Sequence, residues 1–206
     1  MGRHDSLRDF DEHQYARAAP LYHRHFSHRT RLMKRPWHFW LREYSILLTM
    51  AGVITALDQW TKWLVRTLLP PGSVWAPWEW LLPYARIVHW YNRGAAFGML
   101  PGWGTVFTVL AILASALILY YYPRLSPGEW AWRVAMWLQL GGAVGNLIDR
   151  LTLGQVTDFI SVGSFPVFNI ADSSITISVI VLLLGHEVEK RWSRRRMATG
   201  EQGDNG

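Results

Sequence analysis

Two aspartates with different surroundings are the residues of this sequence best suited to chemistry. Asp158 stands among apolar neighbours in VTDFI, and Asp172 follows 14 residues later in FNIADSSI, with a proline-containing loop between them. A loop of that length can fold two carboxyl groups together, and in a pocket of low dielectric constant they would share one proton. Such a pair contains a general acid and a general base, which suits the activation of water against a peptide carbonyl.

Further polar residues stand on the apolar segments or directly beside them, and an ionisable group within such a segment is a functional-site hypothesis by default. They are Asp58, Lys62, Asn92, Asn146, Asp149, Arg150 and Asn169. Each also has a structural interpretation. The i, i+4 spacing of Asp58 and Lys62 allows a plain ion pair, and Asn92 could be a turn residue. Asn169 could cap a helix with Asp172 at its third position, and the 146–150 group could anchor an interface.

The sequence lacks the motifs of other hydrolases. It has no Cys, no H-E-x-x-H and no G-x-S-x-G, which disfavours thiol, metallopeptidase and common serine hydrolase chemistry. Six of the eight His residues lie in residues 1–43, where metal binding is an alternative to a solvated tail. We expect no metal and no cofactor at the aspartates.

Four apolar segments must position these residues. They run over about 41–66, 104–122, 130–148 and 170–188, and each approaches the length of a membrane span. Residues 67–103 contain turn residues, interfacial Trp and a β-prone stretch at 86–91. The predicted fold is a membrane all-α protein, a four-transmembrane-helix bundle with a small extracytoplasmic β element. Its expected parts are a basic tail (1–43), a four-span domain (44–188, with extracytoplasmic segment 67–103) and a second basic tail (189–206).

The charge distribution predicts the orientation of these spans. The net charge is +6, and nine of the 21 Lys and Arg residues precede Tyr44 while five follow Glu189. The positive-inside rule then places both termini in the cytoplasm, and every polar cluster falls at the outer end of the bundle. The basic runs flank apolar segments, so a membrane protein is favoured over a nucleic-acid binder. No cleavable signal peptide is expected.

Five blocks occur in order on these segments: DQWTK, NRGAAFG, GGAVGNLIDR, GQVTDFI and FNIADSSI. Over about residues 44–188 the chain resembles the signal peptidase II family, intramembrane aspartic endopeptidases that cut prolipoprotein signal peptides just before a diacylglyceryl-modified Cys. The resemblance implies that Asp158 and Asp172 are catalytic. It also implies that a further set shapes the site or binds substrate: Asp58, Lys62, Asn92, Gly142, Asn146, Arg150, Asn169 and Ala171. Asp149 belongs to the same motif, and we assign it a supporting role.

The expected partners and location follow from this resemblance. They are a lipid-modified prolipoprotein and membrane lipid, for a monomer in the bacterial plasma (inner) membrane that acts near its outer face. A proton-coupled membrane transporter using intramembrane Asp and Lys is the alternative function. It would usually show more spans and internal repeats, which this sequence does not show. A membrane scaffold would need no convergent carboxylates.

Overall fold

The chain divides into two compact units, residues 1–42 and 43–206. A computed structural model describes residues 36–94, 103–126 and 128–200, without the side chains of 186 and 189–200. Most of the expected N-terminal tail, residues 201–206 of the C-terminal tail and part of the NRGAAFG block therefore lie outside the described residues. Of the first unit, the structure shows residues 36–42, in which Trp37 contacts His38 and Phe39 contacts Trp40 edge to face.

Four helices follow the apolar segments, as the sequence predicts. They are α2 (Trp37–Leu68), α3 (Gly104–Tyr121), α4 (Trp130–Leu153) and α5 (Ile170–Gly200). Three of them extend beyond the predicted ends, and α5 includes residues 189–200, which we expected to be part of a tail. The helix α4 ends where Gly154 adopts φ 71° and donates its backbone N–H to the carbonyl of Arg150. Glycine enters this left-handed region without the steric penalty of a Cβ atom.

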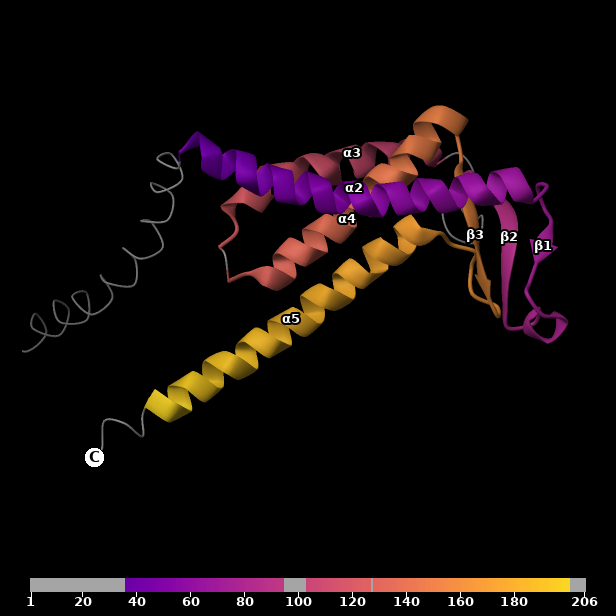
Figure 1. Ribbon diagram of the computed structural model, residues 1–206. Coiled ribbons are helices and arrows are strands. Elements are labelled where there is room, and N and C mark those ends of the chain that lie inside the picture. Colours follow the sequence, from indigo (N-terminus) through magenta and orange to yellow (C-terminus); the bar gives the residue numbers. More distant parts are fainter. Residues whose placement is uncertain (1–35, 95–102, 127, 201–206) are drawn as a thin grey trace, which may run out of the picture. The chain divides into compact units, whose positions relative to one another are not determined.

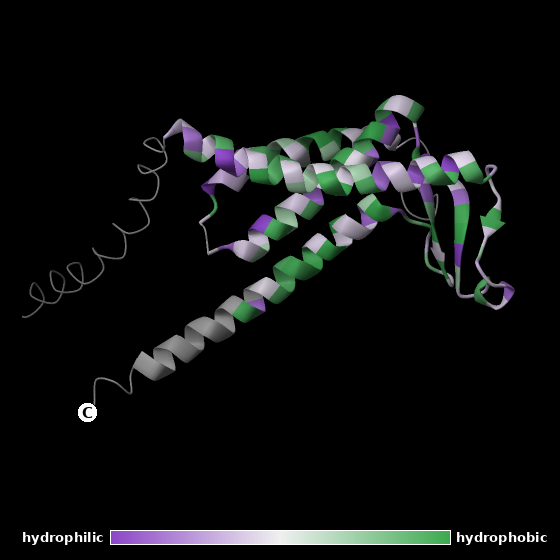
Figure 2. Cartoon of the chain, viewed as in Figure 1, coloured by the Kyte–Doolittle hydropathy of each residue, from purple (hydrophilic) through white to green (hydrophobic). Residues whose placement is uncertain are grey.

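Membrane character differs among the helices. In the described part of the chain, one helix is long and apolar enough to cross a bilayer by length and composition, Gly104–Arg124, and Ile170–Gly185 forms a shorter apolar helix. Hydrophobic residues dominate α3 and the first half of α5, whereas hydrophobic and hydrophilic residues are mixed along α2 and α4 (Figure 2). Those polar positions include the predicted site residues, and they lower the hydropathy of both helices.

A small antiparallel sheet lies at the end of α2 (Figure 1). Its order is β1 (Val74–Trp75), β2 (Ala85–Asn92) and β3 (Val156–Val162). Strand β2 matches the predicted β-prone stretch, but β3 lies in a segment that the sequence analysis treated as loop. That expectation was wrong because β3 pairs with a strand far away in the sequence, and local patterning does not reveal such a partner. The sheet places Asp158 on β3 opposite Trp90 of β2.

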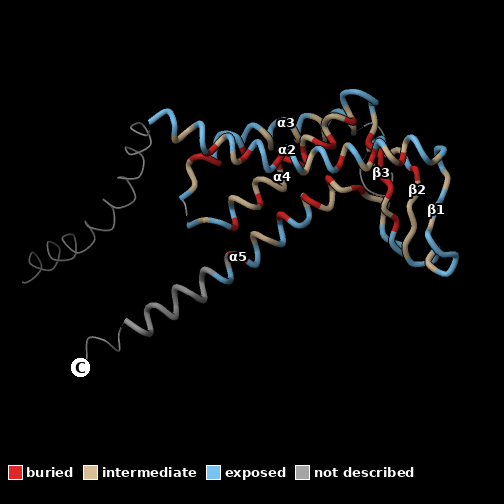
Figure 3. Tube along the Cα trace, viewed as in Figure 1, coloured by how far each residue is buried: buried red, intermediate tan, exposed pale blue. Residues whose placement is uncertain are grey.

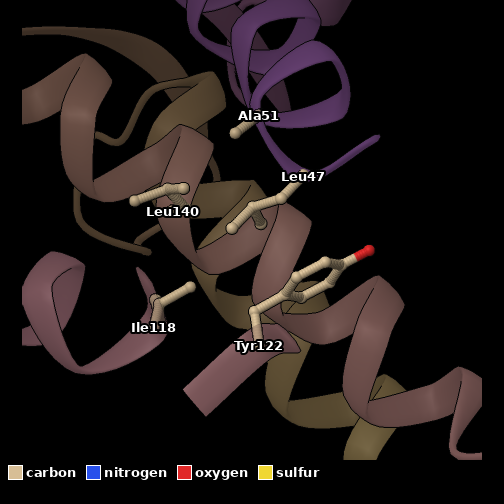
Figure 4. Close-up of a cluster of buried hydrophobic side chains, with 5 residues drawn as sticks. All are labelled: Leu47, Ala51, Ile118, Tyr122 and Leu140. Carbon is tan, nitrogen blue, oxygen red and sulfur yellow. The ribbon is translucent and has the colours of Figure 1, made fainter. Parts of the chain in front are cut away.

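The apolar core lies between the helices, away from the sheet. Side chains from α2, α3, η4 (Tyr122–Arg124) and α4 meet there: Leu47, Ala51, Ile118, Tyr122 and Leu140 (Figure 4). Buried positions continue along α4 to β3, while much of α3 remains exposed (Figure 3). Exposed apolar residues on α3 include Val109, Leu113 and Leu117. An apolar surface of this extent on one element marks an interaction with membrane or protein.

Candidate active site

Three asparagines hold the two aspartates. Asp158 is almost fully buried, and its Oδ1 and Oδ2 accept N–H groups from Asn169 Nδ2 at 2.7 Å and Asn92 Nδ2 at 3.0 Å. Asp172 lies in the first turn of α5, and its Oδ1 accepts an N–H from Asn146 Nδ2 at 2.8 Å. Both aspartates line one cavity of about 560 Å³. The chain thus brings two carboxyl groups from different elements to one opening.

Asn169 contacts both aspartates because it also caps α5. Its Oδ1 accepts the backbone N–H of Asp172 at 2.9 Å, and Asp172 Oδ2 accepts the backbone N–H of Asn169 at 3.3 Å. This reciprocal arrangement satisfies helix-end donors that would otherwise lack partners. The structural interpretation of Asn169 is therefore correct. It does not exclude a role in chemistry, because the amide nitrogen of Asn169 remains free to bind Asp158.

The surroundings of Asp158 favour its protonated form. Burial, together with the negative charge of Asp172, raises the pKa of Asp158 to about 7, against the opposing hydrogen bonds from Asn92 and Asn169 and the charge of Lys62. Near neutral pH, Asp158 therefore retains a proton more readily than an exposed aspartate does. A carboxyl group tuned in this way can serve as a general acid next to an ionised partner.

A buried ion cluster, formed by Lys62, Asp58 and Asp149, contacts Asn146. Lys62 Nζ lies 2.7 Å from Asp58 Oδ2 and 3.3 Å from Asp149 Oδ2, and it donates to Asn146 Oδ1 at 2.9 Å. Lys62 and Asp58 are fully buried. The ion pair that the i, i+4 spacing allows is therefore present. It also fixes the side chain of Asn146, whose amide group donates to Asp172.

Small residues let the elements approach closely around this cluster. A Cβ atom on Gly142 would lie 2.5 Å from the carbonyl oxygen of Ala171, and one on Gly145 would lie 2.6 Å from Asp58 Oδ2. Ala171 is fully buried, and its backbone N–H donates to Asp58 Oδ1 at 2.9 Å. Gly142 and Ala171 therefore contribute space and a backbone donor rather than reactive groups.

Apolar atoms provide most of the exposed surface of the cavity. Besides the aspartates, its polar lining residues are Asn92, Arg150, Ser173 and Thr176, and its apolar lining residues, which the sequence analysis did not name, are Phe107, Phe165, Pro166, Val167, Phe168 and Ile177. The Arg150 guanidinium carbon lies 5.8 Å from the centre of the Phe107 ring. An opening with apolar walls and a few convergent polar groups suits a largely apolar ligand.

Three polar residues that contact the cluster were also missed. Gln59 Nε2 donates to Asp149 Oδ1 at 3.1 Å and to the carbonyl of Gly145 at 2.9 Å. Arg66 Nη1 donates to Thr157 Oγ1 at 3.1 Å. A signal for Arg66 was present, because it continues the i, i+4 series that begins with Asp58 and Lys62. Gln59 and Thr157 gave no comparable signal beyond their places beside Asp58 and Asp158.

The structure brings all of the predicted site residues into this one region. Asn92 and Asn169 contact Asp158, the ion cluster contacts Asn146, and Arg150 borders the cavity. Among the residues that the structure describes, no group of three or more His, Asp or Glu side chains could hold a metal ion.

Comparison with known proteins gives concordant results. A family model described as Signal peptidase (SPase) II matches residues 50–186. A lipoprotein signal peptidase of Geobacillus thermodenitrificans is 43% identical over 143 residues, which cover 68% of this chain and 88% of that protein. A lipoprotein signal peptidase of Acinetobacter baumannii is 44% identical over 147 residues, covering 68% of this chain and 81% of that protein.

The fold has relatives among solved structures. A bacterial membrane enzyme determined by the in meso method at 2.3 Å superposes with a TM-score of 0.64 and 31% identity, over 71% of this chain and 90% of that one. A second such structure, at 1.9 Å, gives a TM-score of 0.60 and 33% identity, over 68% and 91%. The resemblance expected from the five sequence blocks is confirmed.

Proposed function

Because the chain belongs to the signal peptidase II family of aspartic peptidases, we propose that it removes signal peptides from prolipoproteins by means of Asp158 and Asp172. Family membership also decides for an enzyme over the transporter alternative. The observation that carries the assignment of the site is the convergence of both carboxyl groups on one cavity, held by amide donors from three elements.

The two aspartates differ in a way that suggests their roles. Asp158, whose pKa is raised to about 7, begins as the proton donor, which leaves the part of the base to Asp172. Asp172 removes a proton from water, and the oxygen of that water attacks the scissile carbonyl carbon while Asp158 gives its proton to the carbonyl oxygen. When the C–N bond breaks, the proton held by Asp172 passes to the leaving nitrogen, and Asp158 takes back a proton from one hydroxyl group of the tetrahedral intermediate. The fragments are a new carboxyl group and a free amine.

The substrate is a prolipoprotein whose Cys already carries diacylglycerol, cut just before that Cys. The apolar walls around Phe107, Phe165 and Ile177 support a lipid-bearing peptide over a hydrophilic one. This chain is a bacterial membrane enzyme, and the helices α2 to α5 would form its four spans in the plasma membrane. Both termini would then be cytoplasmic and the cavity near the outer face. The chain would act as a monomer.

A cleavage assay tests the enzyme and its lipid requirement together. The purified chain in detergent micelles is incubated with the same prolipoprotein before and after diacylglyceryl modification. We expect release of the signal peptide from the lipidated form and much slower release from the unmodified form. Equal rates for both would contradict recognition of the lipid, and cleavage of neither would contradict the function.

Substitution of the aspartates tests the site. Asp158→Asn and Asp172→Asn should each abolish most turnover, and the double variant should lose little more, because residues that act as a unit are strongly non-additive. Glu79→Gln on the exposed turn between β1 and β2 is the matched control and should cleave normally. Folded single variants that keep near-normal rates would exclude this pair.

Orientation in the membrane has its own test. Reporter fusions at residue 206 and within residues 123–129 should read cytoplasmic, and a fusion at Ser164, just after β3, should read external. A cytoplasmic signal at Ser164 would overturn the four-span arrangement.

A further inference from the structure

We propose that Arg66 and Thr157 form, with Asp149, a clamp that positions Asp158, an inference that rests on the function proposed above. Arg66 and Thr157 belong to none of the residue sets that the family resemblance implies. Thr157 directly precedes Asp158 on β3, and it is fully buried. Its role would be to position a catalytic group, since its own side chain does not border the cavity.

Thr157 is held at three polar atoms by three different elements. Its backbone N–H donates to Asp149 Oδ2 of α4 at 2.9 Å, and its Oγ1 accepts an N–H from Arg66 Nη1 of α2 at 3.1 Å. Its carbonyl oxygen accepts a longer hydrogen bond, 3.4 Å, from Asn169 Nδ2 at the start of α5. Every polar group of this residue is therefore engaged, by residues of α2 and α4 and by the residue that caps α5.

The strand itself needs this support because β3 is at the edge of the sheet. On one side Thr157 and Asp158 pair with Tyr91 and Trp90 of β2, close to an irregularity in the register between Ile87 and Trp90. On the other side no strand pairs with residue 157 among the described residues, and its N–H meets the carboxylate of Asp149 instead. Edge strands leave such donors open unless other groups cover them.

Arg66 adds both charge and direction to the clamp. The ion cluster holds two carboxylates, Asp58 and Asp149, and Lys62 supplies one positive charge to both. Arg66 Nη1 lies 3.5 Å from Asp149 Oδ1, so the same nitrogen contacts the carboxylate and the hydroxyl of Thr157. A guanidinium group is planar and keeps a fixed donor direction, which a lysine ammonium does not.

Position matters here because the contacts of Asp158 are short and specific. Its oxygens lie 2.7 Å and 3.0 Å from two amide nitrogens, and it must face Asp172 across the cavity. One planar peptide bond joins residues 157 and 158, so a shift of residue 157 also displaces the backbone of residue 158. A misplacement of about 1 Å can lower a catalytic rate by on the order of a hundredfold.

The test removes the hydroxyl of Thr157 without changing charge or volume greatly. In Thr157→Val we expect kcat for the lipidated prolipoprotein to fall about fivefold to tenfold, because the loss of the hydrogen bond to Arg66 loosens the position of Asp158, with KM within about twofold of wild type. Thr157→Ser keeps the hydroxyl and should restore kcat. Thr67→Val is the control, since that hydroxyl bonds only the carbonyl of Trp63 in its own helix.

A second variant shows whether Arg66 and Thr157 act together. Arg66→Lys keeps the positive charge but not the fixed donor, so kcat should fall by a similar factor. The double variant Arg66→Lys/Thr157→Val should be no slower than the slower single variant. Losses that multiply would contradict a common clamp. Rates are compared per folded protein, with thermal unfolding as the measure of folding.

A readout independent of cleavage keeps the clamp separate from the proposed function. The charged groups facing Asp158 are Asp172 of α5, Lys62 of α2 and Arg150 of α4, and Thr157→Val alters none of them. The thermal midpoint of the Asp158→Asn variant should rise above that of the wild-type chain as the pH increases. When both chains also carry Thr157→Val, this pH-dependent difference should be smaller, because a looser β3 admits water to Asp158. If the wild-type chain cleaves no substrate but Thr157→Val still reduces the pH-dependent difference in thermal midpoint, the clamp is supported and the proposed function is contradicted. Unchanged kcat and an unchanged pH-dependent difference in a folded Thr157→Val variant would refute the clamp.

Discussion

Replacing Asp158 with Asn should make the chain more stable relative to wild type as the pH rises. The pKa of Asp158 is about 7 in the folded chain and 3.8 in the absence of its surroundings. Between pH 4 and pH 7 the folded chain therefore binds a proton that the unfolded chain has released. Raising the pH through this window costs stability, and above pH 7 the cost is constant. Asn cannot ionise, so the variant does not incur this cost.

The magnitude follows from the two pKa values. The difference between about 7 and 3.8, at about 1.36 kcal/mol for each pH unit, amounts to about 4 kcal/mol over the whole window. The amide group of the variant meets the amide donors of Asn92 or Asn169, which costs about 1–3 kcal/mol. That cost does not depend on pH. It therefore shifts the stability of the variant by a constant amount and does not change how the stabilities of variant and wild type diverge with pH. For a chain of this size each kcal/mol corresponds to roughly 2–4 °C, so the midpoints should diverge by on the order of 10 °C.

Thermal unfolding in detergent micelles from pH 4 to pH 8 measures this divergence. The thirteen tryptophans supply an intrinsic fluorescence signal. Glu79→Gln removes one exposed carboxylate, and its thermal midpoint should differ from that of wild type by the same amount at every pH. If the curves of Asp158→Asn and wild type stay parallel across the range, Asp158 does not hold a proton near neutral pH, and its role as the initial acid is refuted.

Three further substitutions have expected outcomes. Asp172→Asn removes the charge that helps to raise the pKa of Asp158, so the upper end of the pH window over which Asp158 lowers stability should move toward lower pH in the same unfolding series. Gly142→Ala should lower the free energy of unfolding by about 1–3 kcal/mol, because the new Cβ would lie 2.5 Å from a backbone oxygen. In the control Gly52→Ala the new Cβ has no neighbour within 4 Å, so this change should stabilise α2 by about 0.5–1 kcal/mol. Chemical denaturation measures both free energies of unfolding. Lys62→Met leaves two buried carboxylates without their shared cation and should cost about 3–5 kcal/mol, and a folded variant with wild-type stability would show that the buried pair contributes nothing.

Sequence reasoning was most accurate where local pattern decides the structure. The unbroken apolar run of α3 was predicted within a residue at its C-terminal end, since no polar position interrupts it. The start of α5 was also predicted, because Asn169 caps it. The helices α2, α4 and α5 extend past their apolar segments, because a helix continues through polar residues until a breaker such as Gly154 ends it.

The rest of the site depends on contacts between distant segments. The i, i+4 series on α2 indicates a shared face, but not that Lys62 lies between two carboxylates from two helices. The pairing of β3 with β2 joins segments that are separated by two helices, so the sequence around Asp158 looks like a loop when it is considered alone. The approach of the two aspartates could be expected from the loop between them. The bridge that Asn169 makes between them could not.

The order of strands in the sheet has a consequence for how this protein is made. Strands β1 and β2 leave the ribosome well before β3, and they share only two residue pairs, Val74 with Val88 and Trp75 with Ile87. An isolated pair of strands is marginally stable at best, so the sheet must wait for β3 before it forms. Asp158 arrives on that last strand, and Asp172 follows it. The first helices of the nascent chain therefore emerge before either aspartate has been made, and the proposed carboxyl pair can assemble only after Asp172 has left the ribosome.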